Sequence, residues 1–353
     1  MRWRWYRRIL IALAFMATLG GTVIYINTVS TEEKQEVSKR NLDDKTLIPG
    51  GEPIGIYMET DGILVLDTEN LEDIQGNMCE PSKNIIKKGD YIISINQIQV
   101  EDKYDLIHEV AQLTGPEVEL GIRRENECFE VSFKAVEVDE KEYKLGIWVR
   151  DNVQGLGTVT YITKDNQFGA LGHGIHDVDT DELLKIKGGN VYDINIVGIQ
   201  KGKRGEPGGM EGVIVYNKRN VLGDINANSE NGIYGIIENK EKLIEEEECV
   251  EICGKKDINL GDAVIRSAIT GEVKEYKIKI ISVDYFARNE NKRIMIEVVD
   301  KELLELTGGI VQGMSGSPII QDGKLVGAVT HVLVNDPTRG YGIFIENMLK
   351  AVE

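Results

Sequence analysis

The chain has 353 residues and a formal net charge of −18, from 41 lysines and arginines against 59 aspartates and glutamates. This acidic balance argues against nucleic acid as a partner and against broad electrostatic binding to anionic lipid. Hydrophobic residues make up 41% of the sequence, which suffices for packed cores and excludes global disorder. The 38 glycines and an aromatic content of 6% favour a turn-rich, mainly β protein with room for two modest domains.

The N-terminus carries a membrane-targeting pattern. Four arginines, at positions 2, 4, 7 and 8, precede an uncharged apolar run over Ile9–Ile26. This run is about long enough to cross a bilayer, and the arginines should stay cytoplasmic, so we expect residues 1–27 to be a tail and single anchor with the rest of the chain exported. A cleaved signal peptide is the alternative because Ala14, Ala17 and Gly20 are small. The length of the run favours the uncleaved anchor.

A polar stretch of mixed charge follows the apolar run. Residues 28–52 are therefore predicted to be a linker, and the segment from Asn27 to Asp44 has the composition of a solvated tether. The turn-forming sequence Pro49-Gly50-Gly51 marks the start of the first folded unit.

Residues 53–137 are predicted to form an α+β domain. Ile54–Met58 and Ile63–Leu66 have the pattern of two strands joined by a hairpin at Asp61-Gly62. The apolar spacing over Tyr104–Leu113 predicts a helix. Further strands are expected after a Lys-Gly-Asp turn and after the helix, at 91–96, 118–122 and 129–133.

This unit resembles a PDZ domain. Lys88–Asn96 is similar to the internal Gly-Asp strand motif of that family, and Pro53-Ile54-Gly55-Ile56 stands where its carboxylate-binding loop would be. The resemblance implies that a peptide C-terminus or an internal strand adds to the edge at Ile54–Glu59, beside the helix. His108 would lie on that helix as a surface or groove residue.

Residues 138–353 change character to short strands separated by glycine turns. Many short strands at close spacing predict a β-barrel or sandwich. The clearest strand patterns are 155–162, 193–199, 277–283 and 293–299.

A serine flanked by glycines is the strongest chemical signal in this region. In Gly313-Met314-Ser315-Gly316 the glycine two residues before Ser315 lets the backbone N–H groups of Gly313 and Ser315 point at one spot, where an oxyanion would sit. Ser315 is therefore the candidate nucleophile of an acyl-transfer reaction. Ser317 is a weaker alternative because it lacks the preceding glycine spacing, and an exposed serine in an ordinary turn is the non-catalytic interpretation.

Serine needs an adjacent base, and histidine is the usual one. The chain has four histidines. His173 lies between Gly172 and Gly174, where the backbone can hold the ring in the open, so it is the preferred base over His176 and His331. The order of base before nucleophile is that of trypsin-like peptidases.

Several segments together resemble the SpoIVB peptidase family of endospore-forming bacteria. They are 169–175, 177–180, 307–320, 327–332 and 335–342. The resemblance implies a membrane-anchored, PDZ-containing serine peptidase of sporulation that faces the space between the two forespore membranes. It implies cleavage of a regulatory membrane protein, and of the enzyme itself, which triggers intramembrane processing of a late sigma factor. His173 and Ser315 carry over directly.

The resemblance also implies Asp300 as the third catalytic residue. Asp300 lies closer to Ser315 than the trypsin pattern would place it, and Asp224 is the rival by its spacing from His173. Because an apolar helical pattern follows Asp300, a helix N-cap is the structural alternative.

No cofactor is required by this chemistry, and no metal site is expected. The four cysteines, Cys79, Cys128, Cys249 and Cys253, form no Cys-x-x-Cys motif, and whether they pair is left open. Two other functions compete with the peptidase of sporulation. One is a catalytically silent adaptor that recruits a membrane partner through its PDZ-like unit, and the other is a general envelope quality-control protease.

Overall fold

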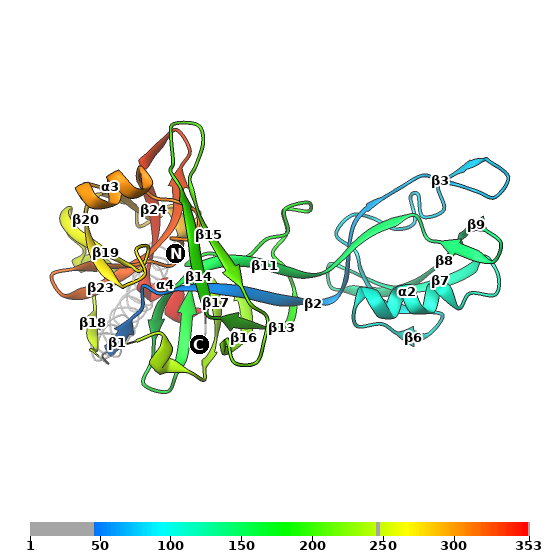
Figure 1. The fold of residues 1–353 in the computed structure, drawn as a ribbon, viewed down its shortest axis with the longest axis horizontal. Helices are drawn as coiled ribbons and strands as arrows, with labels where there is room; N and C mark the ends of the chain where they lie inside the picture. The colour runs from blue at the N-terminus through cyan, green and yellow to red at the C-terminus, as the bar shows by residue number, and fades with distance from the viewer. Residues whose placement is uncertain (1–45, 245–247, 352–353) are drawn as a thin grey trace, which may run out of the picture.

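The fold is described from a computed structural model, in which residues 46–244 and 248–351 are placed. The protein is mainly β, as predicted, with three α-helices among these residues. Figure 1 shows a larger and a smaller body joined by two long strands. The predicted anchor and the tether before residue 46 lie outside the described residues, and no helix within these residues is long and apolar enough to cross a membrane.

Two strands belong to both bodies. They are β2 (Pro53–Thr68) and β11 (Ile147–Ile162), each 16 residues long. They pair antiparallel from Ile147 opposite Thr68 to Thr158 opposite Pro53, with irregular register where the two bodies meet. A paired ribbon, and not a flexible linker, therefore connects the bodies (Figure 1).

The smaller body packs helix α2 (Lys103–Ala111) against a small sheet. Its other elements are β3 (Leu71–Glu72), β4 (Met78–Cys79), β5 (Tyr91–Ile95), β6 (Ile98–Gln99), β7 (Glu117–Arg124), β8 (Glu127–Lys134), β9 (Val136–Asp139) and β10 (Glu142–Lys144). Asp102 caps α2 by accepting the N–H groups of Tyr104 and Asp105. A separate apolar cluster that runs in sequence from Ile63 to Val149 fills this body.

The first half of the larger body is a closed barrel. Strands β2, β11, β12, β17, β16 and β13 pair antiparallel in a ring that returns to β2. The new strands are β12 (Gln167–Ala170), β13 (Ile186–Tyr192), β16 (Val221–Ser229) and β17 (Gly232–Ile237), followed by the short η1 (Lys240–Lys242); the hairpin β14 (Ile194–Gln200) and β15 (Gly209–Ile214) leaves the ring. Ile54, Ile56 and Phe168 are among the buried residues of its core.

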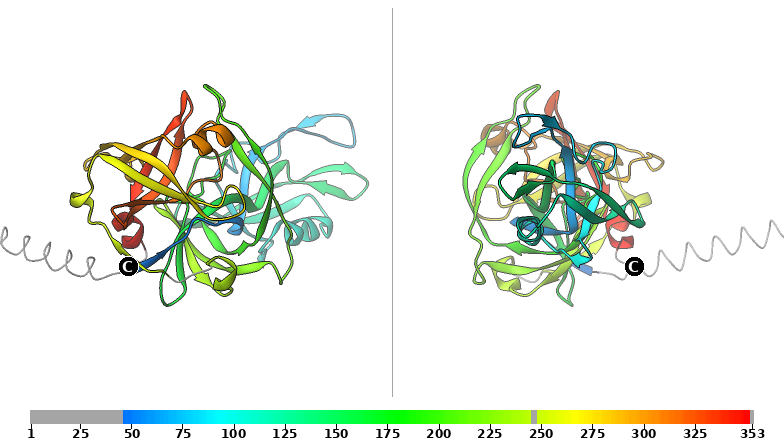
Figure 2. Two further views of the ribbon diagram at one scale, coloured as in Figure 1. Left: turned by 60° about the vertical axis from the view of Figure 1, so that its left-hand side comes forward. Right: turned by 90° about the vertical axis from the view of Figure 1, so that its right-hand side faces the viewer.

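The second half is another closed barrel. Strands β19, β20, β21, β24, β23 and β22 pair antiparallel in a second ring. Its elements are β18 (Val250–Ile252), η2 (Lys255–Asp257), β19 (Gly261–Ser267), β20 (Lys274–Val283), η3 (Glu290–Lys292), β21 (Ile294–Val298), α3 (Lys301–Thr307), β22 (Pro318–Gln321), β23 (Lys324–Leu333), β24 (Asp336–Phe344) and α4 (Ile345–Lys350). This barrel lies on the side away from the smaller body in the views of Figures 1 and 2.

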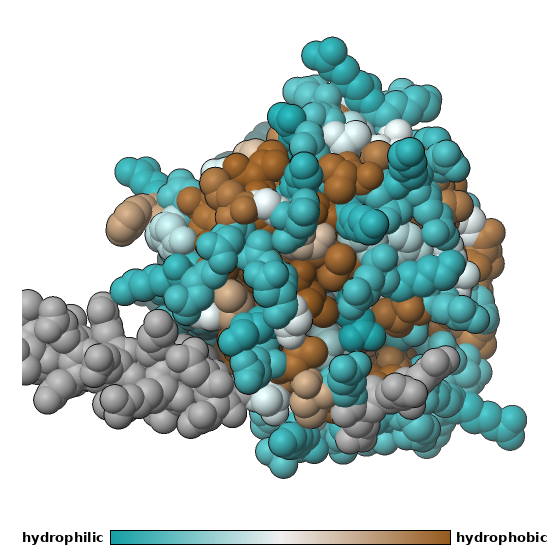
Figure 3. Space-filling model, turned by 90° about the vertical axis from the view of Figure 1, so that its left-hand side faces the viewer, coloured by the Kyte–Doolittle hydropathy of each residue, from teal (hydrophilic) through white to brown (hydrophobic). Residues whose placement is uncertain are grey.

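The face of the larger body turned away from the smaller one is mostly hydrophilic. In Figure 3 polar side chains cover most of this face and hydrophobic ones show in the gaps between them.

All four cysteines are free thiols, including the buried Cys253. The barrels are therefore held by their apolar cores and backbone pairing.

Two sequence predictions fail around β2. Asp61-Gly62 does not close a hairpin, because both halves of the segment belong to one strand that pairs with β11. Pro53–Ile56 is not an open peptide-binding edge, because β11 pairs with it on one side and β13 pairs with Gly55 and Ile56 on the other, while Ile54 and Ile56 are buried in the first barrel.

The predicted linker is wrong at its C-terminal end. Residues Thr46–Pro49 form strand β1, which pairs with both β11 and β18. Leu47 of this strand is 3% exposed and belongs to the apolar cluster between the barrels.

Candidate active site

The candidate catalytic residues meet where the two barrels join. His173 follows β12 of the first barrel, whereas Ser315 precedes β22 and His331 lies on β23 of the second. The rings of His173 and His331 are 5.1 Å apart, centroid to centroid. Ser315 Oγ donates a hydrogen bond to the carbonyl of Thr330, the residue before His331. The structure thus brings Ser315 and two of the four histidines together.

The turn that carries Ser315 has the backbone shape its glycines predict. Gly313 and Gly316 have φ of 98° and 97°, which L side chains rarely adopt. At Gly316 a Cβ atom would stand 2.0 Å from the carbonyl oxygen of Thr158, so only glycine fits there. Within the described chain, the N–H groups of Gly313 and Ser315 donate to no protein acceptor. Two backbone donors are therefore available beside the Ser315 hydroxyl.

Two threonines on β11 hold this turn in place. Thr158 donates its N–H to the Ser315 carbonyl at 2.9 Å and its Oγ1 to the Gly313 carbonyl at 2.8 Å. Thr160 donates its Oγ1 to the Gly316 carbonyl at 2.8 Å. Both threonines are at most 1% exposed. These bonds tie the carbonyls of Gly313 and Ser315 to the first barrel, and so hold in place the backbone of the turn that carries the Gly313 and Ser315 N–H groups.

The His173 ring is oriented by its own backbone. Its Nδ1 lies 2.9 Å from the carbonyl of Gly174. That carbonyl can only accept, so Nδ1 carries the proton and Nε2 is left as the basic nitrogen. Burial lowers the pKa of His173 from its usual 6.5, the charge of His176 adds to this, and the Gly174 carbonyl opposes it. His173 is therefore neutral, and able to accept a proton, at neutral pH.

His331 stands beside this base as a second neutral imidazole. Burial, with smaller contributions from the charges of His173, Lys292 and His176, lowers its pKa to about 4. Its Nδ1 is buried and has no hydrogen-bond partner. A neutral ring in this position adds no charge to the site and covers one side of His173.

The loop after His173 is held to the β16–β17 turn. Asn228 accepts the N–H of Ile175 at 2.9 Å and donates to the Ile175 carbonyl at 2.8 Å. Gly174 donates its N–H to the carbonyl of Glu230. His176 faces the Glu230 carboxylate at 3.4 Å, and its Nδ1 lies 3.4 Å from the same Gly174 carbonyl that orients His173. It is therefore a neighbour of the base with a pairing role of its own.

Ser315 is not yet engaged with the base. Its hydroxyl is directed to the Thr330 carbonyl at 2.8 Å, and no hydrogen bond joins Ser315 to His173. A rotation about the Cα–Cβ bond of Ser315 is needed before Nε2 of His173 can accept the hydroxyl proton.

Asp300 is placed as a helix N-cap. Its carboxylate accepts the N–H of Leu303, in the first turn of α3, and the N–H of Lys277, both at 3.2 Å. Asp224 is exposed on β16 and accepts from Asn190 at 2.8 Å. Neither carboxylate has a hydrogen bond to His173 in the described structure, and Gly174 takes the place at Nδ1 that a third catalytic residue would occupy.

Ser317 is enclosed in the barrel. Its side chain is 0% exposed and its Oγ has no partner, so substrate cannot reach it. Among the described residues no cluster of three or more His, Cys, Asp or Glu side chains could hold a metal ion.

Sequence reasoning missed Thr158 and Thr160. The signal was present as alternating threonines in the apolar strand 155–162, which places both hydroxyls on one face. What they contact lies 155 and 156 residues away along the chain and could not be read locally.

The site combines a serine between glycines, two backbone N–H groups without acceptors and a neutral histidine. These are the nucleophile, the oxyanion-hole donors and the base that a serine peptidase requires. A model of the family described as SpoIVB peptidase S55 matches residues 141–349, more than half of the chain. The chain belongs to this family, which confirms the resemblance seen in the sequence, and is a serine peptidase. No curated protein matches the sequence.

Solved structures with some likeness include forms of Rv3671c from M. tuberculosis. A mutant in its inactive form has 14% identity and a TM-score of 0.30, with 56% of this chain and 82% of that chain covered. The active form of the Rv3671c protease has 13% identity and a TM-score of 0.30, with 56% and 72% covered.

Proposed function

We propose that the protein is a membrane-anchored serine endopeptidase of sporulation signalling. In this proposal Ser315 is the nucleophile, His173 the general base, and the N–H groups of Gly313 and Ser315 form the oxyanion hole. The observation that carries it is the fixed turn at Ser315, with two unpaired backbone donors, facing a base of lowered pKa. Each of the two barrels supplies one part of the site, which supports the proposal of a trypsin-like peptidase domain.

The reaction is acyl transfer. Ser315 Oγ turns from the Thr330 carbonyl toward His173 Nε2, loses its proton to it and attacks the substrate carbonyl carbon. The negative charge on the carbonyl oxygen is stabilised by the N–H groups of Gly313 and Ser315. His173 then donates the proton to the leaving amine, and water releases the acyl group by the reverse sequence. The Gly174 carbonyl, which accepts from Nδ1, orients the ring throughout.

The cellular role follows from the family and the N-terminal pattern. We infer that the anchor at residues 1–27 holds the enzyme on the forespore membrane, facing the intermembrane space. Its substrate would be a regulatory membrane protein whose cleavage triggers intramembrane processing of a late sigma factor. We also assign the smaller body as a PDZ-like domain, because it combines a sheet, a capped helix and a Gly-Asp turn at Gly89-Asp90.

The test is incubation of the purified chain beside its Ser315→Ala and Ser317→Ala variants, with mass spectrometry of the products. The parent and Ser317→Ala should yield the same fragments and Ser315→Ala none, a loss of about 10⁴-fold or more. We expect the first cut of the enzyme itself between Asn27 and Asp44, in the polar tether.

Two outcomes would contradict the proposal. Equal cleavage by the parent and Ser315→Ala would exclude Ser315 as nucleophile. Cleavage by neither, with the regulatory substrate present, would favour the adaptor function.

A further inference from the structure

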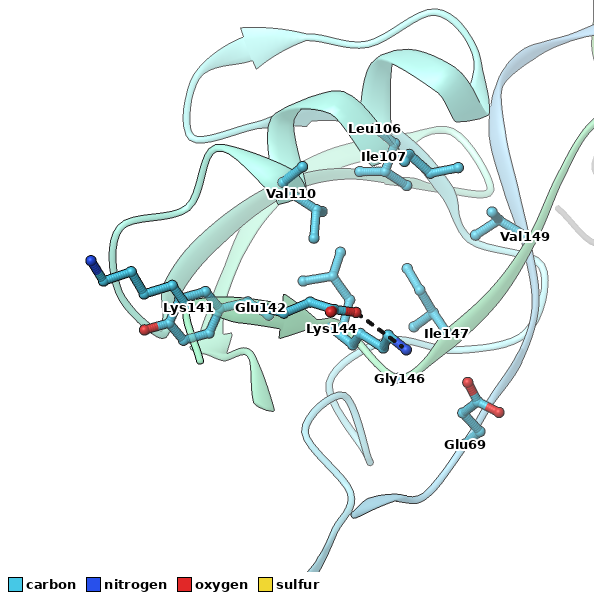
Figure 4. A pocket seen from close by; sticks show the side chains of 13 residues that line it. Glu69, Leu106, Ile107, Val110, Lys141, Glu142, Lys144, Gly146, Ile147 and Val149 are labelled. Carbon is cyan, nitrogen blue, oxygen red and sulfur yellow. Dashed lines mark ion pairs between the residues drawn. The ribbon is translucent and has the colours of Figure 1, made fainter. Parts of the chain in front are cut away.

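The β14–β15 hairpin has no role in the chemistry described so far. It leaves the first barrel, and Figure 1 shows it rising beside β24 of the second. The pocket between α2 and the start of β11 lies in the smaller body instead, where Leu106, Ile107 and Val110 line it from the helix (Figure 4). That pocket goes with the proposed PDZ-like domain, whereas the hairpin reaches the turn that carries Ser315.

The side chain of Met210, near the start of β15, anchors the hairpin in the second barrel. Met210 is 8% exposed and belongs to the apolar cluster of that barrel, together with Ile310 and Val311. Ile196 and Ile199 of β14 pack against the same cluster. A hairpin that starts in the first barrel is thus packed into the core of the second.

Backbone hydrogen bonds hold the tip of the hairpin, residues 201–208, to the second barrel as well. Gly202 donates its N–H to the carbonyl of Thr307, the last residue of α3, at 2.8 Å. Gly205 donates its N–H to the carbonyl of Val334, between β23 and β24, also at 2.8 Å. The hairpin therefore cannot move away from the second barrel without breaking main-chain hydrogen bonds.

The start of β15 pairs with the residue just before the nucleophile turn. Gly209 and Gln312 form a parallel bridge. In it Met210 donates its N–H to the Gln312 carbonyl at 2.9 Å, and Gln312 donates its N–H to the Gly208 carbonyl at 2.8 Å. The Gln312 carbonyl and the Gly313 N–H belong to one planar trans peptide unit, so they point in opposite directions. The bond from Met210 therefore sets the direction of the Gly313 N–H, one of the two proposed oxyanion donors.

The other proposed donor is set within the turn itself. The Ser315 N–H shares its peptide unit with the Met314 carbonyl, and this carbonyl accepts the N–H of Ser317 at 3.0 Å. The direction of the Ser315 donor thus depends on local structure, whereas that of the Gly313 donor depends on the hairpin.

Glycine at position 313 leaves this peptide unit free to turn over. Its φ is 98°, and glycine adopts negative φ values about as readily. In the reversed orientation the Gln312 carbonyl would take the direction that the Gly313 N–H has now. The site would then lose one donor and gain an acceptor that repels the oxyanion. Among the described residues, the Met210 N–H is the donor that holds the Gln312 carbonyl in its present direction.

We propose that Met210 is a positioning residue of the peptidase, whose N–H selects the orientation of the Gln312–Gly313 peptide unit that presents the Gly313 N–H to the oxyanion. The β14–β15 hairpin is the element that holds this N–H in place. The proposal rests on the proposed role of Gly313 as an oxyanion donor. A molecule with the hairpin displaced would keep its nucleophile and base but lose half of its oxyanion hole.

The test uses the full chain in detergent micelles and a fluorophosphonate–rhodamine probe, which labels an active serine. Met210→Pro removes the N–H that reaches Gln312 and spares the pairing with β14, and Gly209 before it tolerates a following proline. Its maximal labelling rate should fall about 100-fold, the usual cost of one oxyanion donor. Met210→Leu keeps the N–H and nearly the same side-chain volume, so its rate should stay within about 3-fold of the parent.

A second replacement removes the same N–H without a proline ring. The α-hydroxy analogue of methionine, incorporated at position 210, puts an ester oxygen in place of the N–H and keeps the side chain. It should lower the maximal labelling rate by a similar factor of about 100. In both variants the probe concentration at half-saturation and the midpoint of the acid limb of labelling against pH should be unchanged, because the base His173 is untouched. A general loss of structure would alter both.

The outcomes separate this proposal from the proposed function. No labelling of the parent, or labelling of Ser315→Ala at the parent rate, would contradict the proposed function itself. Labelling of Met210→Pro and of the ester variant at the parent rate, with Ser315→Ala unlabelled, would overturn the role of Met210 alone. An equal loss in Met210→Leu would overturn it too, because the effect would then belong to the side chain and not to the N–H.

Discussion

Thr158 shows how a residue outside the reacting atoms can set the geometry of the site. Its two hydrogen bonds fix the carbonyls of Gly313 and Ser315, and with them the path of the turn whose N–H groups would receive the oxyanion. Preorganised donors of this kind lower the activation barrier by several kcal/mol, because they need not reorient during the reaction. The first barrel therefore shapes a turn that belongs to the second.

The state of His173 gives a prediction about pH. The base must be neutral, and burial lowers its pKa from 6.5, so activity should persist as the pH falls and be lost only below 6.5. The acid limb of kcat/KM against pH should have its midpoint below that value. His176→Gln should move the midpoint slightly upward, because the His176 charge contributes to the lowering.

A midpoint above 6.5 would contradict this account of the base. A carboxylate at Nδ1 would stabilise the imidazolium and raise the pKa, so such a result would restore an aspartate to the site. Far-UV circular dichroism over the same pH range checks that the limb does not report unfolding.

At the scale of elements, α3 allows the two roles of Asp300 to be separated. Asp300→Asn keeps a side-chain oxygen for the cap but removes the charge that a triad needs. We expect its kcat/KM to stay within about 2-fold of the parent. Asp300→Ala should cost about 1 kcal/mol in the free energy of unfolding, measured in urea, with activity per folded molecule retained.

The opposite pattern would identify Asp300 as catalytic. If Asp300→Asn lost activity by about 10⁴-fold while its unfolding curve matched the parent, the carboxylate would act on His173 and not only on the helix.

Local patterns in the sequence predicted the elements whose partners are near in the chain. The helix at 104–113 and the strands around Tyr91 and Phe129 are present as α2, β5 and β8. The hairpin at Asp61-Gly62 failed because the turn dipeptide is a local signal, whereas β2 pairs with a strand more than eighty residues later.

The same distinction applies to the site. Ser315 and His173 could be identified from their glycine neighbours, because glycines on both sides indicate a backbone conformation that other residues rarely adopt. Asn228 could not, because it is an ordinary polar residue whose partner, Ile175, is brought near only by the closed barrel.

For the whole molecule, the shared strands predict cooperative unfolding. Leu64, Tyr91 and Leu184 form a buried cluster where the two bodies meet, and β2 and β11 run through both cores. Differential scanning calorimetry should show one transition. Leu64→Ala should lower the temperature of this transition, because it reduces the free energy of unfolding by about 2–5 kcal/mol. Ile74→Ala, in an exposed position of the smaller body, is the matched control.

Two separate transitions, with only one of them moved by Leu64→Ala, would show that the bodies unfold independently. In that case the ribbon of β2 and β11 would connect two bodies whose stabilities are independent.

The position of β1 limits how the enzyme can be set free. Thr46–Pro49 pairs with both β11 and β18, and Leu47 is buried between the barrels, so this strand closes the structure at the point where the chain enters it. If the proposed anchor is present, a cut before Thr46 would free a peptidase with β1 still in place, whereas a cut after Pro49 would detach the strand that pairs beside the one carrying Thr158. The self-cleavage proposed above would therefore either release the molecule or open its structure, depending on a difference of a few residues in the position of the cut.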